Sequence, residues 1–444
     1  MPEPNFPFEI PAIRAAAQRA LAAREKIVAA SPDWETWRQQ AHAIKSEVIA
    51  HLDDYLAELE TKVRGWGGQV FHAAAAGEAN AHLTALARRH GTRLVVKAKS
   101  MTSEEIGLTT ALTAAGLEVV ETDLGEFIVQ VAGDRPSHLT APAMHLNRRD
   151  IGRLFAERLH LPRQTEPEAL SRQGAAYLRQ RFWQAQIGIT GVNFAAAASG
   201  HLVMLENEGN LRLSAAAPAV HVAVMGLEKV IPRLADLEVF LRLLPASATG
   251  QRLTAYVNFL AGLKPQPGGR QAFYLVLLDN GRRRLAAEPL LREALYCLRC
   301  GACLNICPIF QVGGGHLYGQ VYPGAIGIIL AAYLGGHGDL TDLCTQCGAC
   351  AQICPVGIAL PAHIARLRRR SRSHPWLRAA VRGAGVILRH PTLYRGLTPL
   401  GRRLWQQVPA GRQAAWWGEH RQPPAVPPHS FFELQQSTPG PEKP

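Results

Sequence analysis

The spacing of apolar residues predicts a helical start to the chain. Residues 12–60 are rich in good helix formers and are interrupted by Ser31-Pro32-Asp33. After this break the apolar positions recur at helical spacing: Ile44, Val48, Leu52, Leu56 and Leu59. We therefore expect two helices, the second running from about residue 34 to residue 60, that pack against the rest of the protein.

From residue 60 to residue 133, short apolar runs alternate with helical patterns. Apolar runs predict four strands, at residues 70–73, 93–100, 117–122 and 126–131. Helices are expected between them, one over residues 77–90 and one that ends at Gly116. Thr102-x-x-Glu105 predicts a capping box at the start of the second helix. Strands and helices that alternate at this spacing favour a parallel or mixed α/β sheet.

A second strand-rich segment follows a helical stretch at residues 148–186. Its predicted strands are residues 187–194, 201–206, 210–213, 220–226, 253–259 and 273–278. Helices are expected at residues 232–244 and 288–296, the latter leading to the first cysteine. The predicted domains are a helical segment (1–60), an α/β domain (61–284), a helical cysteine module (285–370) and a basic segment rich in Arg, Trp and Pro (371–444).

All eight cysteines lie in two runs of identical spacing, Cys-x2-Cys-x2-Cys-x3-Cys-Pro. The first run begins at Cys297 and the second at Cys344. Such a loop can bind three corners of a [4Fe–4S] cube, and in two-cluster ferredoxins the fourth cysteine of each run binds the other cluster. The first predicted ligand set is Cys297, Cys300, Cys303 and Cys354. The second predicted ligand set is Cys344, Cys347, Cys350 and Cys307.

Zinc and disulfides are the alternative uses of these cysteines. Paired Cys-x2-Cys motifs bind zinc, but a four-thiolate zinc site has no use for a third cysteine in each run. A secreted disulfide framework does not confine its cysteines to two tight loops. The spacing therefore favours two [4Fe–4S] clusters. The segment between the runs is too long for a compact ferredoxin, and residues 327–334 read as a helix, so we expect an all-α, ferredoxin-like module.

The net charge of +13 is concentrated near the C-terminus. Residues 361–444 hold 14 basic and 3 acidic residues, which leaves 34 basic and 32 acidic residues before them. Such a tail suits an anionic membrane surface, nucleic acid or an acidic partner. Trp376, Trp405, Trp416 and Trp417 lie among its arginines, and residues 423–428 read as an extended linker. No recognised nucleic-acid motif accompanies the tail.

Residues 1–12 do not resemble a signal peptide, which favours a cytoplasmic protein.

Two polar groups in the α/β domain are candidate ligand sites. Lys97 and Lys99, with Ser100 and Thr102, lie at a strand end before a helix, where an anion can bind; a solvated strand end is the alternative. Glu206, Glu208 and Asn210 form a polar turn after a Gly- and Ala-rich stretch, which predicts either a pocket with a carboxylate at its edge or a simple turn. His138 and His145 are more typical of structural histidines than of metal ligands.

Sequence alone assigns no catalytic residue. The chain contains neither a G-x-x-x-x-G-K-[ST] loop nor a G-x-G-x-x-G motif after a strand, so the sequence indicates no nicotinamide or flavin site.

The chain resembles the lactate-utilisation iron–sulfur protein B family. The matching stretches are residues 95–108 (V-V-K-A-K-S-M-T-S-E-E-I-G-L), 118–126, 135–145, 205–210 (L-E-N-E-G-N), 221–232, the first cysteine run, 314–327, and P-A-V-P-P-H-S-F-F-E-L near the C-terminus. The family pattern has Pro where this sequence has Ala325.

This resemblance implies an electron-transfer subunit of a complex that oxidises L-lactate to pyruvate. It implies two partners, one cysteine-rich and one that shares the α/β domain, and a sugar-isomerase/CoA-transferase-like fold for that domain. The oxidation site lies on this chain or on a partner. The alternatives are an iron–sulfur subunit acting on another hydroxy acid, and a nucleic-acid-binding protein with structural clusters.

Overall fold

The computed structural model describes residues 10–263, 265–266, 269–371, 375–407 and 429. The chain separates into two compact units, Met1–Ser371 and Arg372–Pro444. The further division of the first unit into three domains stays a prediction.

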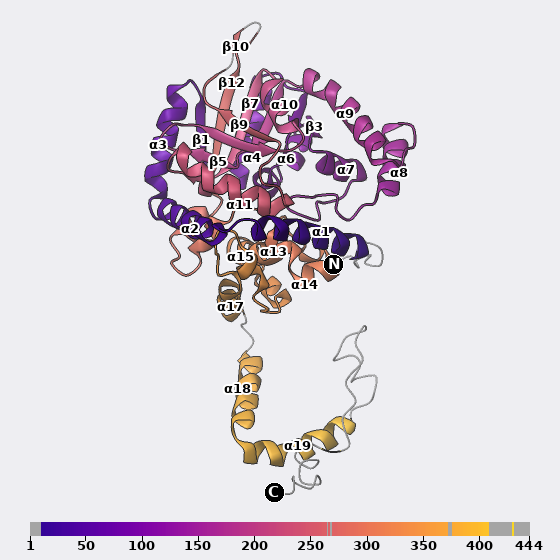
Figure 1. The fold of residues 1–444 in the computed structure, drawn as a ribbon, viewed down its shortest axis with the longest axis vertical. Coiled ribbons are helices and arrows are strands. Elements are labelled where there is room, and N and C mark those ends of the chain that lie inside the picture. Colours follow the sequence, from indigo (N-terminus) through magenta and orange to yellow (C-terminus); the bar gives the residue numbers. More distant parts are fainter. Residues whose placement is uncertain (1–9, 264, 267–268, 372–374, 408–428, 430–444) are drawn as a thin grey trace. The chain divides into compact units, whose positions relative to one another are not determined.

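Six parallel strands form the central sheet of the first unit, in the order β1-β12-β7-β4-β2-β3 (Figure 1). They are β1 (Gln69–Ala73), β2 (Leu94–Lys97), β3 (Glu118–Glu121), β4 (Ile187–Gly191), β7 (Val220–Gly226) and β12 (Ala272–Leu278). Every residue of β7 is buried, as is typical of a parallel strand covered on both faces. The predicted parallel or mixed α/β sheet is therefore confirmed.

A second, mixed sheet has four strands in the order β8-β5-β6-β9. They are β5 (Phe194–Ala196), β6 (Leu202–Glu206), β8 (Val230–Ile231) and β9 (Tyr256–Leu260). The predicted strand at residues 187–194 is thus two strands, β4 and β5, in different sheets. Two short strands, β10 (Pro265–Gln266) and β11 (Gly269–Arg270), pair as an antiparallel hairpin.

Helices connect these strands and cover the central sheet (Figure 1). They are α4 (Ala76–Arg89), α5 (Met101–Glu105), α6 (Leu108–Ala114), α7 (Leu124–Ala132), α8 (Arg148–Leu159), α9 (Pro167–Gln184), α10 (Asn210–Ala216) and α11 (Leu237–Thr249), with the short 3₁₀ helices η1 (Leu227–Lys229) and η2 (Leu234–Asp236).

Two predicted strands are helices in the structure. Residues 126–131 belong to α7, because Asp123 caps its start by accepting a hydrogen bond from the Glu126 N–H and Gly133 ends it in the left-handed region. Residues 210–213 belong to α10, whose first N–H groups donate to the Glu206 carboxylate. In both segments the apolar residues predicted a strand, but a side-chain cap stabilises a helix instead.

The predicted capping box at Thr102 is also wrong. The helix begins two residues earlier than expected, because Ser100 is the N-cap and its hydroxyl accepts from the Ser103 N–H at 3.3 Å. Glu105 is not a capping residue but pairs with a buried arginine. Gly107, at φ +61°, separates α5 from α6.

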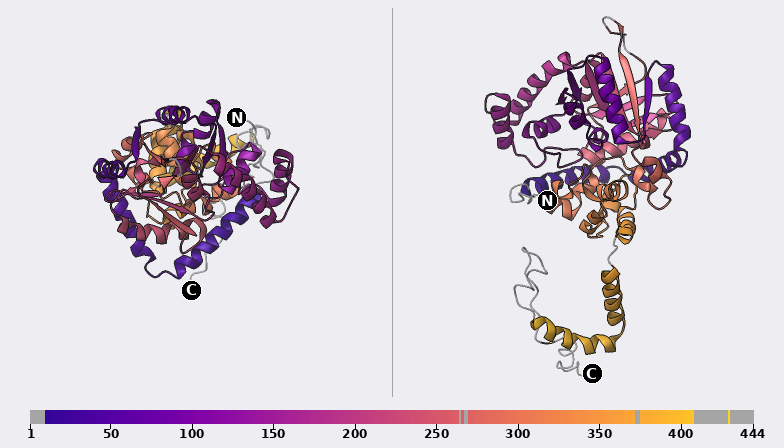
Figure 2. Two further views of the ribbon diagram at one scale, coloured as in Figure 1. Left: turned by 90° about the horizontal axis from the view of Figure 1, so that it is seen from above. Right: turned by 180° about the vertical axis from the view of Figure 1, so that it is seen from behind.

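Three N-terminal helices pack beside the sheet domain and the cysteine region. They are α1 (Ile10–Ala29), α2 (Trp34–Ala50) and α3 (Leu52–Gly65). The long helix expected from residue 34 to residue 60 is interrupted at His51, which ends α2 and precedes α3. Helix α1 packs against α11 of the sheet domain and against α13 and α14 of the cysteine region, so it lies between the two (Figure 2).

The cysteine region is helical, as expected. Its elements are α12 (Arg282–Ala286), η3 (Arg292–Tyr296), α13 (Ala302–Asn305), α14 (Pro308–Gly313), η4 (His316–Tyr318), α15 (Gly324–Leu334), η5 (Gly338–Leu343), α16 (Ala349–Ile353) and α17 (Leu360–Ser371). The helix expected at residues 288–296 is a 3₁₀ helix over residues 292–296 only.

In the part of the second unit that the structure describes, there are two helices, α18 (Pro375–Arg389) and α19 (Pro391–Gln406). The predicted linker at residues 423–428, and Trp416 and Trp417, lie outside the described residues. Among the helices that the structure describes, none combines the length and the apolar character needed to cross a membrane.

Candidate functional site

The two cysteine runs share one backbone geometry. Arg299 and Gln346, two residues after the first cysteine of each run, both adopt the left-handed region at φ +62° and +59°. Each directs its N–H at the sulfur of that first cysteine, at 3.4 Å in both runs. Gly301 and Gly348 are also left-handed and begin the short helices α13 and α16, which pack against each other. The two cysteine runs therefore fold into loops with the same local backbone conformation.

The cysteines line two separate cavities, and each cavity takes three cysteines from one run and one from the other. The first is lined by Cys297, Cys300, Cys303 and Cys354. The second is lined by Cys307, Cys344, Cys347 and Cys350. Four thiols around one small space fit the chemistry of a metal cluster or a metal ion.

The first cysteine cavity is the more deeply buried of the two. Three of its four cysteines are buried, whereas in the second cavity Cys350 is buried and Cys347 is exposed. Burial raises the pKa of Cys300 to about 12 and that of Cys354 to about 11. These thiols keep their protons in the absence of metal, so metal binding there releases protons.

Basic side chains of the N-terminal helices hold the end of the second run in place. Arg24 donates to the Ile353 carbonyl at 3.0 Å, and Arg38 donates to the Cys354 carbonyl at 2.9 Å. His42 donates from Nδ1 to the Val356 carbonyl at 2.8 Å. These three contacts position Cys354 beside the first run.

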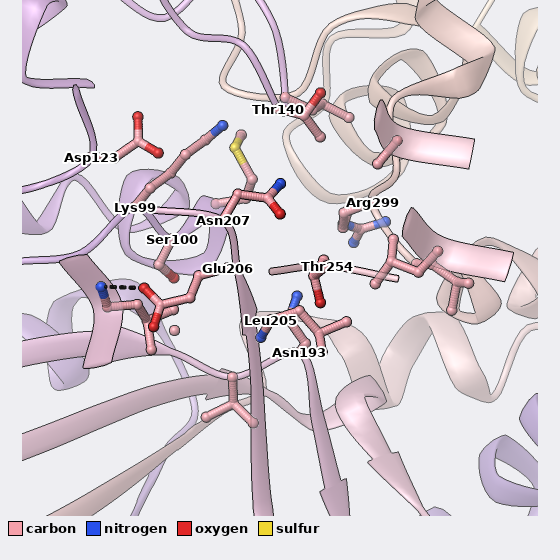
Figure 3. A pocket seen from close by; sticks show the side chains of 18 of the residues that line it. Lys99, Ser100, Asp123, Thr140, Asn193, Leu205, Glu206, Asn207, Thr254 and Arg299 are labelled. Atoms are coloured by element: carbon pink, nitrogen blue, oxygen red, sulfur yellow. Dashed lines mark hydrogen bonds between the residues drawn. The ribbon is translucent and has the colours of Figure 1, made fainter. Parts of the chain in front are cut away.

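A larger cavity of about 270 Å³ opens at the carboxyl ends of the central strands. After β2 the chain proceeds outward to β3, whereas after β4 it proceeds in the other direction to β7. Ligands of open α/β sheets bind in the crevice at such a switch point. Lys99 and Ser100 follow β2 and Asn193 follows β4, and all three line the cavity (Figure 3).

This cavity brings together the two polar groups that the sequence indicated separately. Lys99, Ser100, Thr102, Glu206, Glu208 and Asn210 all line it. The Glu206 carboxylate accepts from the N–H groups of Leu211 and Arg212 and from Asn258, so it is a helix cap at the cavity wall. Burial raises the pKa of Glu208, which accepts from the Leu124 N–H.

Three cationic side chains also face this cavity. They are Lys99, Lys229 and Arg299, and Figure 3 shows Lys99 and Arg299 reaching in from opposite sides. Burial lowers the pKa of Lys229 to about 8. Within the described residues, no carboxylate lies within salt-bridge distance of the Lys99 or Lys229 amine. The two amines and the guanidinium can therefore bind the carboxylate of a small organic acid.

Lys97 does not line this cavity. Its side chain is fully buried, and its amine lies 2.7 Å from Glu104 and 2.9 Å from Glu121. Burial alone would lower the pKa of Lys97, but Glu121 and Glu104 raise it. Lys97 is thus occupied by carboxylates of the protein itself, which the sequence could not show because both come from other elements.

Glu126 lies buried near these charges, and we expect it to make stability depend on pH. Burial raises its pKa to about 8. The folded protein keeps this proton over a range in which the unfolded chain loses it, so the free energy of unfolding falls as pH rises toward 8. We expect Glu126→Gln to be stabilising, by roughly 2–3 kcal/mol more at about pH 9 than at about pH 6.

Urea unfolding at these two pH values measures the effect. Glu157→Gln, at an exposed position of α8, makes the same chemical change and serves as the matched control. An equal effect of Glu126→Gln at both pH values would show that Glu126 does not carry this proton.

The large cavity adjoins the first cysteine cavity. Leu139, Leu298 and Arg299 line both. Arg299 lies 3.4 Å from Glu228 and stacks over the Tyr322 ring at 4.8 Å. A ligand in the large cavity would therefore be separated from the first set of cysteines by a single layer of side chains.

A buried ion-pair network supports Arg299. Glu228 also pairs with Arg282 at 2.5 Å, and Arg282 donates two hydrogen bonds to Glu105, at 2.8 and 2.7 Å. Burial alone would raise the pKa of Glu228, but Arg282 and Arg299 lower it to about 2. This network joins α5, η1 and α12 to the first cysteine loop.

Both candidate histidines have structural partners. His138 is buried, its Nδ1 accepts the N–H groups of Thr140 and Ala141, and burial lowers its pKa to about 3. His145 lies 3.1 Å from Asp134 and 2.8 Å from Ser137, and its hydrogen bond lowers the Asp134 pKa to about 2.

Among the lining residues of the large cavity that sequence reasoning missed are Asp123, Asn193, Lys229 and Arg299. Lys229 follows the predicted strand at residues 220–226, and a strand-end rule applied to every strand would have identified it. No sequence signal places Arg299 there, because it belongs to the cysteine loop.

Comparison with known proteins identifies both parts of the first unit. Residues 56–274 match the LUD domain, and residues 293–358, which contain all eight cysteines, match the 4Fe-4S dicluster domain. The match to the 4Fe-4S dicluster domain indicates iron–sulfur clusters.

Several curated proteins are similar over most of the chain. The uncharacterized electron transport protein YkgF of Escherichia coli K12 is 42% identical over 334 residues, 75% of this chain and 70% of that protein. Lactate utilization protein B of Bacillus pumilus is 40% identical over 73% of this chain and 68% of its own length. The protein of the same name from Shouchella clausii is 38% identical, over 82% and 79%.

A crystal structure of a DUF162 family protein from Deinococcus radiodurans aligns with a TM-score of 0.29 and 13% identity, covering 51% of this chain and 98% of that one.

Proposed function

The chain belongs to the lactate utilization protein B family, and we propose that it is the iron–sulfur electron-transfer subunit of a multi-protein system that oxidises L-lactate to pyruvate. The 4Fe-4S dicluster match and the names of the relatives support an electron-transfer role in lactate utilisation. The proposed partners are a cysteine-rich subunit and a second subunit with an α/β domain.

We assign two [4Fe–4S] clusters to the crossed cysteine sets. Cys297, Cys300, Cys303 and Cys354 would hold one, and Cys307, Cys344, Cys347 and Cys350 would hold the other. When bound, two such clusters can carry one electron each, which matches the two electrons released by lactate oxidation. The N–H groups of Arg299, Gln346 and Ile358 point at cysteine sulfurs, and hydrogen bonds of this kind raise reduction potentials.

The wall shared by the large cavity and the first cysteine set is the observation that supports this function best. Leu139, Leu298 and Arg299 lie between a polar cavity and buried thiols. The other cysteine set lies nearer the surface, where Cys347 is exposed. The chain's own residues therefore connect an internal ligand site with a surface that a redox partner can reach.

The large cavity is proposed to bind a small 2-hydroxy or 2-oxo acid. Lys99, Lys229 and Arg299 would hold its carboxylate, and Asn210 and the carboxyl groups of Glu206 and Glu208 also line the cavity. A different hydroxy acid would fit the same groups, so the substrate has to be determined by a comparison of acids.

The proposed sugar-isomerase/CoA-transferase-like fold of the sheet domain rests on family resemblance.

Replacing Lys229 tests the proposed carboxylate site. We expect Lys229→Gln to weaken binding of pyruvate roughly 10- to 100-fold, because a hydrogen bond to a charged group contributes about 1.5–3 kcal/mol. Isothermal titration calorimetry on the anaerobic protein measures the dissociation constant. Lys26→Gln, at an exposed position of α1, removes the same charge far from the cavity in sequence and should bind as the unmodified protein does. Equal binding by both variants would contradict the site.

Lactate-dependent reduction tests the function itself. The anaerobic protein is mixed with the two partner subunits and with L-lactate, D-lactate or glycolate, and loss of visible cluster absorbance is followed. Reduction by L-lactate is the expected result. Reduction by a different acid alone would replace the substrate, and no reduction by any acid would overturn the function.

A further inference from the structure

The second unit carries a helix whose apolar and basic residues lie on different faces. In α18, Val381, Ala384 and Leu388 recur at steps of three and four residues, which places them on one side of the helix. Arg382 and Arg389 are seven residues apart and share another side. The Val381 and Leu388 side chains are 64% and 69% exposed.

The next helix repeats this arrangement. In α19, Leu393, Leu397, Leu400 and Leu404 recur at steps of four, three and four, so all four lie on one face. Arg395 and Arg402 are seven residues apart and lie away from these leucines. Each of the four leucines is 41–57% exposed. A soluble helix normally buries such a face against a core.

Charge identifies what can cover these apolar faces. Residues 375–406 contain six arginines and no aspartate or glutamate. A helix with an apolar stripe of leucines and valines, arginines on its other side and no acidic residue has the composition of one that lies in the interface of an anionic bilayer. Nucleic acid would use the arginines but leave the leucine stripe without a partner.

We propose that α18 and α19 bind the surface of an anionic phospholipid membrane. Their leucines and valines would enter the boundary between headgroups and acyl chains, and their arginines would contact the lipid phosphates. This goes beyond the proposed function, which requires no membrane, and it assigns a specific role to the basic segment.

Vesicle flotation with the full chain tests the proposal. We expect binding to vesicles that contain phosphatidylglycerol, at least tenfold weaker binding to pure phosphatidylcholine vesicles, and weaker binding at raised salt. The double variant Leu400→Asp, Leu404→Asp should reduce binding to the anionic vesicles at least tenfold.

A matched control separates the apolar faces from net charge. Leu253→Asp with Leu290→Asp introduces the same two charges at exposed leucines, 53% and 47% exposed, in the first unit. This variant should bind vesicles nearly as the unmodified chain does, and equal iron content of all proteins shows that the first unit of each is folded.

Three results would overturn the proposal. They are binding to neither type of vesicle, equal losses in the two double variants, and salt-sensitive binding to a random single-stranded oligonucleotide without vesicle binding. The last result would assign the segment to nucleic acid instead.

Discussion

Cys307→Ala is expected to lower the iron content from about eight to about four atoms per chain, and the lost cluster should be that of the other cysteine run. Cys307 belongs to the first run in sequence, but it lines the cavity of Cys344, Cys347 and Cys350. A [4Fe–4S] cluster needs one thiolate for each iron, so the loss of one thiol removes its own cluster. The remaining cluster should keep all four of its ligands.

Two reference variants show which cluster is lost. Cys347→Ala removes a ligand that belongs to the second run on any assignment, and Cys297→Ala does the same for the first run. The low-temperature EPR spectrum of reduced Cys307→Ala should match that of Cys347→Ala. A spectrum that matches Cys297→Ala would show that each run binds its own cluster, and the crossed ligand sets would be wrong.

The second large effect is expected from Arg282→Met, which should lower the free energy of unfolding by about 3–5 kcal/mol. Arg282 is 2% exposed and pairs with two carboxylates, that of the buried Glu228 and that of Glu105, whose side chain is 11% exposed. Methionine fills similar space but leaves both negative charges without their main partner. The cost arises from that unpaired buried charge, because the intact pair contributes little net stability.

The adjacent arginine provides the control. Arg283 is half exposed and pairs with Asp53, which is mostly exposed, so Arg283→Met should change the free energy of unfolding by less than about 0.5 kcal/mol. Urea unfolding of the anaerobic proteins compares the two. Equal midpoints for Arg282→Met and Arg283→Met would contradict a structural role for the network.

The central strands could be predicted from sequence because their residues are buried on both faces. Val95 and Val96 lie in β2, and β7 is apolar except for His221. Short runs of this kind between turns are typical of buried parallel strands. The segments that became α7 and α10 have equally apolar patterns over a few residues. Their helical state depends on the carboxylates of Asp123 and Glu206, which cap the helices. The spacing of apolar residues along the chain does not reveal such caps.

The spacing of the cysteines within each run is visible in the sequence, and the ligand sets inferred from it stay a prediction; the large cavity could be predicted only in part. The spacing of the cysteines within a run is a local property, so it can be read directly from the sequence. The cavity draws on loops that follow five different strands and on the cysteine loop itself, which supplies Arg299. Lys97 was predicted to contact a ligand because it lies at a strand end. In the structure its positive charge is instead neutralised by Glu104 and Glu121.

Iron and sulfide analysis, combined with EPR of the anaerobically purified and reduced protein, tests the central claim most directly. We predict about eight irons and eight sulfides per chain and a signal from two interacting spins. About two zinc ions per chain without iron would show that the crossed cysteines hold structural metal, and the electron-transfer function would be contradicted.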